Sequence, residues 1–371
     1  MAGLTEDARS RRAAELRLIA TDIYWAWRFG WDASRVGTTI GIPALCLMSP
    51  LSLIVYEARR YLAKIDPFLP LRYSDFIEQA RHRIKLFDDN QRGIEGVIGY
   101  AAVVIAAHRS HFVALTGDSL ADDLGLYEYH GRLICTSHVA QFNIGTPPDV
   151  IGTGDRRETS HGIGVEIGQY IRSLGDPIKE VFQNWDWDGR SFLETYDESE
   201  VDFIDVVADN YYGARSGSGL PASVVLALDI CRCNLNTIEV LLSPDPSPLA
   251  LEFLFKIRFV TLHHILNGLA QLRADQAHNL TPAQLDLLRG LEEHPTTQLL
   301  RSRSGRWLRN ALVHYQIANQ VPTSALDYTS PIAGLVDFYL SRDFSVVAAE
   351  VQSHAERVAE ALDRWPTTSD A

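Results

Sequence analysis

Three residues in the segment 306–315 could act together on a phosphodiester. Arg309, Asn310 and His314 form an Arg-Asn-x-x-x-His string. Histidine can take a proton from a ribose 2′-hydroxyl or return one to the leaving oxygen, because its unperturbed pKa lies near neutrality. Arginine can hold a phosphate and balance the charge that builds in the transition state, and asparagine can orient either partner. This chemistry requires no metal, and it would cut RNA and spare DNA because the 2′-hydroxyl is the nucleophile.

A helix is expected to carry this string. Apolar residues recur at three- and four-residue spacing from Trp307 to Ala318, with no Pro or Gly after Gly305. The pattern predicts a helix over about 305–319. The string would then lie near the helix start, where the first amide groups lack internal partners and favour anions.

The same helix would gather polar side chains. Arg306, Asn310 and His314 would lie one turn apart on one face, and the long Arg309 side chain could curl back towards His314. Cations also cluster just before the string and are expected to bind RNA: Arg301, Arg303 and Arg306. The alternative for this cluster is a solvated loop and helix start.

At these residues the chain resembles the HEPN family of RNA-cutting and RNA-binding helical domains. The family signature is an Arg followed after four to six residues by His, often with Asn directly after the Arg, which Arg309, Asn310 and His314 match. A second family feature is an acidic residue four positions before Lys or Arg on a preceding helix, which Glu252 and Lys256 match. The resemblance covers about residues 221–365 and does not extend to the first half of the chain.

The resemblance implies a metal-independent endoribonuclease that needs no cofactor. His314 would be the general acid or base, Arg309 would hold the phosphate, Asn310 would position, and Glu252 and Lys256 would support them. Two bundles would pair in a homodimer, and the products would carry a 2′,3′-cyclic phosphate and a 5′-hydroxyl. A role as a toxin or in defence against phage is also implied, with an antitoxin or regulatory partner.

Two other functions are compatible with the same residues. A non-catalytic HEPN-like bundle could bind RNA, a nucleotide or a partner protein. A helical structural or interaction protein could carry a surface Arg and a core-edge His with no connection to RNA. Glu252 and Lys256 could likewise be a simple surface pair one turn apart.

Composition limits the functional classes. The net charge of −13 over 371 residues argues against broad affinity for polyanions but leaves room for a local basic cleft. The four cysteines include Cys231 and Cys233, which would point to different faces of a helix, so neither a zinc site nor a disulfide framework is expected. A reducing cytoplasm fits this cysteine usage best.

The expected fold class is mainly α. A mostly helical N-terminal region of unknown fold, a possible sensor, would cover 1–145, a loop-rich acidic connection 146–220, and a HEPN-like helical bundle 221–371. Periodicity and proline positions predict the helices of the bundle at about 221–242, 249–273, 281–293, 305–319, 330–340 and 344–362. Strand signals, such as 132–136, are isolated and confined to the first half.

One segment raises the question of a membrane. Val36 to Tyr56 is uncharged and long enough to span a bilayer. Pro43 and Pro50 are expected to interrupt it, and several Ser and Thr residues dilute its hydrophobicity. The segment is therefore expected to be a buried core element, with no membrane contact.

Overall fold

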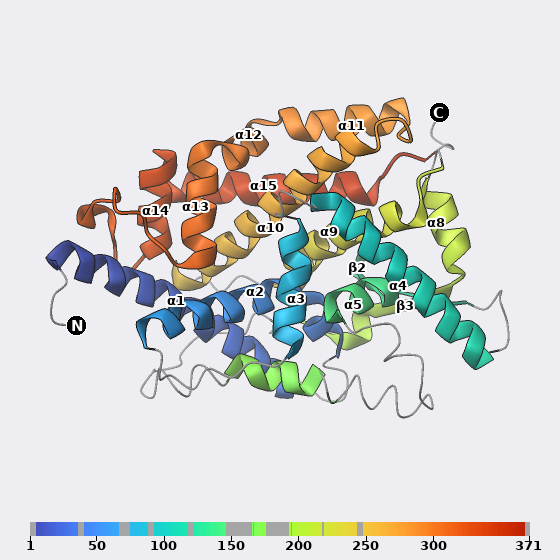
Figure 1. The fold of residues 1–371 in the computed structure, drawn as a ribbon, viewed down its shortest axis with the longest axis horizontal. Helices are drawn as coiled ribbons and strands as arrows, with labels where there is room; N and C mark the ends of the chain where they lie inside the picture. The colour runs from blue at the N-terminus through green and yellow to red at the C-terminus, as the bar shows by residue number, and fades with distance from the viewer. Residues whose placement is uncertain are drawn as a thin grey trace.

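The chain folds as a mainly α-helical protein with a small sheet at one end (Figure 1). The computed structural model describes residues 5–35, 41–66, 75–87, 93–116, 122–145, 165, 167–175, 193, 195–216, 219–242 and 248–367. Over these residues the fold class expected from the sequence is confirmed.

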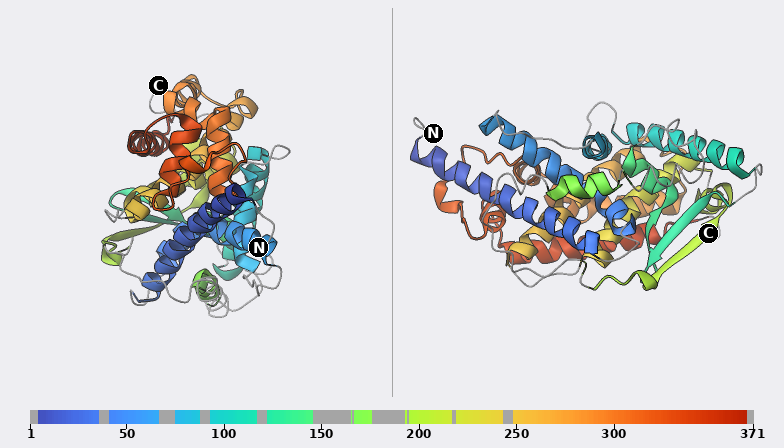
Figure 2. Two further views of the ribbon diagram at one scale, coloured as in Figure 1. Left: turned by 90° about the vertical axis from the view of Figure 1, so that its left-hand side faces the viewer. Right: turned by 90° about the horizontal axis from the view of Figure 1, so that it is seen from below.

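The N-terminal region contributes most of the strands and several long helices. Its elements are α1 (Glu6–Arg35), α2 (Gly41–Ile65), α3 (Asp75–Leu86), α4 (Gly93–Thr116), β1 (Leu124–Tyr129), β2 (Arg132–Thr136) and α5 (Ser137–Ile144). The strand predicted at 132–136 is confirmed as β2. Figure 2 shows the sheet at the end of the molecule opposite the start of α1.

The sheet is antiparallel in the order β2-β1-β3, and β3 (Val201–Val206) lies in the segment that was expected to be an acidic connection. In its register Tyr127 lies opposite Cys135 on one side and Phe203 on the other. The sequence gives no strand signal at β3, because apolar side chains such as Phe203 and Ile204 are exposed there and no buried face imposes an alternating pattern.

The C-terminal part of the chain is a succession of helices. They are α8 (Ala208–Ser216), α9 (Ala222–Leu241), α10 (Pro248–Asp275), α11 (Pro282–Glu293), α12 (Pro295–Arg301), α13 (Arg303–His314), α14 (Pro331–Leu340) and α15 (Phe344–Asp363). The helices expected at 221–242, 249–273, 281–293, 330–340 and 344–362 are confirmed as α9, α10, α11, α14 and α15. The short α12 was not expected, since its seven residues are too few for a periodic pattern.

Helix α13 ends earlier than its sequence pattern predicts. Tyr315 adopts the left-handed conformation with φ of 54° and ends the helix at His314. The buried Tyr315 side chain donates a hydrogen bond to Asp22 of α1 over 2.7 Å, and the amide of Ile317 donates to Glu15 of α1 over 2.9 Å. Contacts with α1 therefore outweigh the local preference for continuing the helix.

The apolar core runs across the boundaries expected near residues 145 and 220. Helix α9 packs against α4, β2 and α15, and α2 packs against α3, α5, α9 and α13. One continuous cluster of buried side chains extends from Ala14 to Trp365. Helix α13 consequently lies where the N-terminal and C-terminal regions meet (Figure 1).

Helix α2 covers most of the uncharged segment that raised the question of a membrane. Over Ile42–Ile65 it is long and apolar enough to cross a bilayer, and 72% of its most apolar window is buried inside the protein. The expected interruption at Pro50 is wrong, because the helix continues through this residue. Packing against α1, α3 and α5 outweighs the single backbone hydrogen bond that an interior proline removes.

Candidate active site at the Arg309–His314 motif

Helix α13 begins at a tight junction with α12. The Ser302 hydroxyl accepts a hydrogen bond from the Gly305 amide over 3.0 Å and so caps the helix. A Cβ atom on Gly305 would lie 2.3 Å from the Leu300 carbonyl oxygen, so only glycine allows the two backbones to approach this closely. The apolar face of α13 is buried, which directs the motif residues away from the core.

The motif lies in the C-terminal half of α13 and not near its start. Arg309 is in the middle of the helix and His314 is its last residue. The amide groups at the N-terminus of α13 are therefore not directed at the motif, and the expectation that they would favour an anion there is wrong. The motif was placed near the helix start because the helix was expected over about 305–319, whereas it begins at Arg303 and ends at His314.

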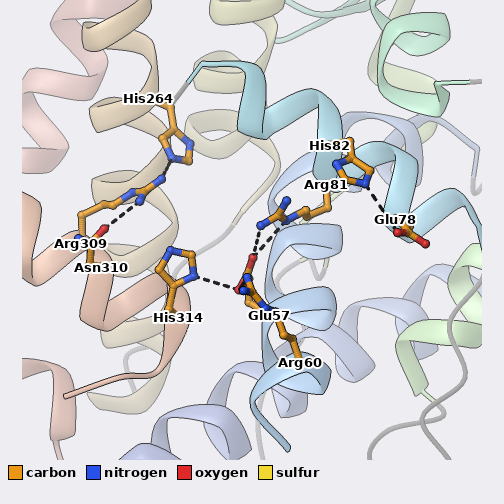
Figure 3. Close-up of polar contacts among 9 residues, drawn as sticks. All are labelled: Glu57, Arg60, Glu78, Arg81, His82, His264, Arg309, Asn310 and His314. Atoms are coloured by element: carbon orange, nitrogen blue, oxygen red, sulfur yellow. Dashed lines mark hydrogen bonds and ion pairs between the residues drawn. The ribbon is translucent and has the colours of Figure 1, made fainter. Parts of the chain in front are cut away.

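The His314 imidazole is partly exposed and makes a hydrogen bond with the N-terminal region. Its side chain is 34% exposed, and its Nδ1 lies 2.9 Å from Oε2 of Glu57 on α2. Figure 3 shows the ring between the Arg309 and His264 pair on one side and the Glu57 and Arg81 pair on the other.

Glu57 is a buried carboxylate with partners at both of its oxygens. Its side chain is 2% exposed, and Oε1 accepts hydrogen bonds from Nη2 and Nε of Arg81 on α3 over 2.6 and 3.1 Å. Nη1 of Arg60 lies 3.6 Å from Oε2. Burial alone would raise the pKa of Glu57, but the hydrogen bonds and charges of His314 and Arg81 outweigh it and lower the pKa to about 2. Glu57 is thus an anion at physiological pH.

Arg309 is held by two side chains. Its Nη1 donates to Oδ1 of Asn310 over 2.9 Å, and its Nη2 lies 2.9 Å from Nε2 of His264 on α10. Because arginine can only donate, His264 is the acceptor. Burial lowers the pKa of His264 to about 4, which keeps its ring neutral. Burial also lowers the pKa of Arg309 to about 10, so the guanidinium remains a cation at neutral pH.

A groove gives solvent access to His314. It has a volume of about 150 Å³ and is lined by Glu57, Arg60, Tyr61, Lys64, His314 and Gln316. Arg60 and Lys64 lie one turn apart on α2 and bring two cations to this groove. The motif histidine is therefore accessible to a ligand, in spite of the core that surrounds α13.

Glu252 has a structural contact outside the groove. This buried carboxylate accepts hydrogen bonds from the amides of Ile332 and Ala333 over 3.3 and 2.9 Å and from the Ser330 hydroxyl. It thereby satisfies amide groups in the first turn of α14. Burial raises the pKa of Glu252, and these hydrogen bonds oppose that shift.

Lys256 lies on the same helix as Glu252 but has different partners. Its buried ammonium group pairs with Asp22 of α1 and lies 4.2 Å from the centroid of the Tyr315 ring. Since Lys256 and Glu252 each contact another element, the surface pair considered from the sequence is wrong. Neither side chain lines the groove at His314, and a supporting role for them in catalysis stays a prediction.

Replacing Glu252 by alanine is expected to lower the free energy of unfolding by about 1–3 kcal/mol, because a buried and a partly buried amide in the first turn of α14 lose their acceptor. Urea unfolding measures this change. The matched control is Glu350→Ala, which removes a half-exposed partner of Arg342 and should cost about 1 kcal/mol or less. Activity per folded molecule, measured beside stability, tests the predicted supporting role of Glu252, and a large loss of activity at unchanged stability would confirm it.

The three arginines expected to bind RNA lie towards the other end of α13. Arg301 donates to Glu292 over 3.1 Å, Arg303 stacks at 4.5 Å on the Trp307 ring, and Arg306 is exposed. Twelve helical residues span about 18 Å, so this cluster is separated from His314 by most of the length of α13. Their binding of RNA stays a prediction.

The sequence did not indicate two residues that contact the motif, Glu57 and His264, or Arg81, which holds Glu57. Glu57 and Arg81 come from α2 and α3, and His264 comes from α10. Glu57 is not part of any recognisable residue spacing in the sequence, so no pattern indicates its role. The only available hint for His264 was a pair of adjacent histidines in a nearly all-apolar helix.

No family model, curated protein or solved structure matches the chain. Among the described residues, no group of three or more His, Cys, Asp or Glu side chains is arranged to hold a metal ion. The charged and titratable groups that line the groove include the His314 imidazole, the ionised Glu57 carboxylate, the Arg60 guanidinium and the Lys64 ammonium group, which can transfer protons and bind anions. Arg309 lies beside His314 but does not line the groove.

Proposed function

We propose that this chain is a metal-independent endoribonuclease of the HEPN type, in which His314 is the general acid or base and Arg309 holds the phosphate. The observation that carries the proposal is the position of an accessible imidazole at a groove, with a partly buried guanidinium beside it. An accessible histidine beside an arginine is the pair that acid-base cleavage of RNA requires.

The reaction proceeds by attack within the substrate. The ribose 2′-oxygen loses its proton to a base and forms a bond to phosphorus, and the bond from phosphorus to the 5′-oxygen breaks. The leaving oxygen takes a proton from an acid, which yields a 2′,3′-cyclic phosphate and a 5′-hydroxyl. His314 performs one of the two proton transfers, and Arg309 balances the charge on the non-bridging oxygens.

The second proton transfer is assigned to a second copy of the chain. A homodimer that pairs two bundles would bring two Arg309 and His314 sets to one RNA strand, as the HEPN resemblance implies. Asn310 is exposed and accepts from Arg309, so it orients the guanidinium. Arg60 and Lys64 make the groove locally basic within a protein whose net charge is −13.

The cellular setting belongs to the same proposal. RNA is the substrate, the site of action is the cytoplasm, and the biological role is that of a toxin or a defence effector against phage. An antitoxin or regulatory protein would then hold the activity in check.

A cleavage assay in chelator tests the proposal. Purified protein is incubated with labelled RNA in EDTA, beside the same sequence as DNA and as RNA with 2′-O-methyl groups. We expect cleavage of the unmodified RNA alone, with cyclic phosphate ends that acid converts to monophosphate. Binding of RNA without cleavage would favour the non-catalytic binding module, and neither binding nor cleavage would favour an interaction protein without an RNA function.

A further inference from the structure

We infer that Glu57 is a positioning residue for His314, held in place by Arg81, and that the active site is therefore built from both regions of the chain. Helix α13 supplies the imidazole, and α2 and α3 supply the pair that fixes its orientation and tautomer. A catalytic role for Glu57 rests on the proposed ribonuclease function. The contact itself does not depend on the substrate.

The hydrogen bond assigns the proton on the ring. An ionised carboxylate can only accept, so Nδ1 of His314, 2.9 Å from Oε2 of Glu57, must be the protonated nitrogen. In a neutral imidazole the other nitrogen, Nε2, is then the one with a lone pair. Glu57 thus leaves Nε2 as the atom that exchanges a proton with the substrate.

Arg81 prevents the carboxylate from turning away. It makes two hydrogen bonds to Oε1, which leaves Oε2 directed at the ring. Arg81 is itself buried, and its guanidinium packs 4.7 Å from the centroid of the Tyr56 ring. Because hydrogen bonds and charges at Glu57 lower its pKa to about 2, the acceptor stays ionised at every pH suitable for cleaving RNA.

The negative charge of Glu57 has a second effect, on the protonated form of His314. When His314 takes a proton it becomes a cation in a neighbourhood that already contains Arg60, Lys64, Arg81 and Arg309. Glu57 is the carboxylate in direct contact with the ring and offsets that repulsion. Removing its charge should therefore slow proton transfer more than it weakens substrate binding.

The test compares two Glu-to-Gln variants. In Glu57→Gln the buried acceptor becomes a neutral amide. The matched control, Glu78→Gln, alters an exposed pair on α3 in which Oε1 of Glu78 lies 3.7 Å from Nε2 of His82. Cleavage kinetics are measured together with the ¹⁵N spectrum of the histidine ring nitrogens, in which the His314 signals are identified by their loss in His314→Gln.

We expect Glu57→Gln to lower kcat on the order of 100-fold with about a twofold change in KM, and Glu78→Gln to change neither. The wild-type spectrum should show His314 protonated at Nδ1, and Glu57→Gln should shift the ring towards the Nε2-protonated form. If Glu57→Gln does not fold, Glu57→Asp is used instead, because it keeps a carboxylate for Arg81 but is too short to reach Nδ1.

The two readouts separate the inference from the proposed function. If the wild-type protein cuts no RNA, the proposed ribonuclease function is refuted. The ring spectrum then still decides whether Glu57 fixes the tautomer of His314. If the wild-type protein cuts RNA and the Glu57 variant has an unchanged rate and an unchanged spectrum, the inference about Glu57 is overturned and the proposed function is not.

Discussion

Replacing His314 by glutamine is expected to lower the rate of RNA cleavage by about 10²- to 10⁴-fold. Glutamine is close to histidine in size and can still donate to Glu57, but it can neither take nor return a proton. The side chain is at the end of α13 and partly exposed, so the change should leave the fold intact. Single-turnover cleavage of labelled RNA in EDTA measures the loss, and RNA binding measured separately should change little.

The control for this substitution is His82→Gln, which removes an exposed imidazole from α3. It should cleave at the wild-type rate. Equal cleavage by His314→Gln and wild-type protein would rule out the imidazole as acid or base. If both variants lost activity to the same extent, the effect would not be specific to the motif.

Replacing Lys256 by methionine is expected to lower the free energy of unfolding by about 3–5 kcal/mol, because Asp22 would keep a buried charge without its partner. Burial lowers the pKa of Lys256 and raises that of Asp22, and the charge of each residue opposes the shift of the other. After the substitution Asp22 would retain only the Tyr315 hydroxyl, at 2.7 Å, among these partners. Chemical unfolding measures the loss.

A second substitution tests whether the unpaired charge of Asp22 causes the loss of stability. Adding Asp22→Asn to Lys256→Met removes the uncompensated charge, so the double variant should be more stable than Lys256→Met alone. The exposed pair of Arg289 and Asp286 is the control, and Arg289→Met should cost about 1 kcal/mol or less. A Lys256→Met protein with wild-type stability but no cleavage would instead show that Lys256 acts in catalysis and does not stabilise the fold.

Most helices could be predicted because their signals are local. Thr281 and Gln284 form a capping box at the start of α11, and Pro331 occupies the first turn of α14. The apolar spacing along 344–362 corresponds to the buried face of α15. These signals require only neighbouring residues, so a single sequence contains them.

The rest of the site depends on residues that are far apart in the chain. Glu57 and His314 are separated by 257 positions, and nothing near Glu57 distinguishes it from any other helical carboxylate. The end of α13 at His314 is likewise decided by Asp22 and Glu15 on α1. Local periodicity cannot reveal contacts between residues so far apart in the chain. The motif could therefore be predicted from the sequence, but the residues around it could not.

The contacts between α1 and the segment after α13 have a consequence for how the protein is made. Glu15 and Asp22 leave the ribosome long before Tyr315 and Ile317, which they bind. His314 and the groove residue Gln316 likewise emerge long after Glu57, so the groove cannot form until this late part of the chain has left the ribosome. Under the proposed ribonuclease function, a nascent chain would therefore be unable to cut the message being translated until the two distant segments have joined.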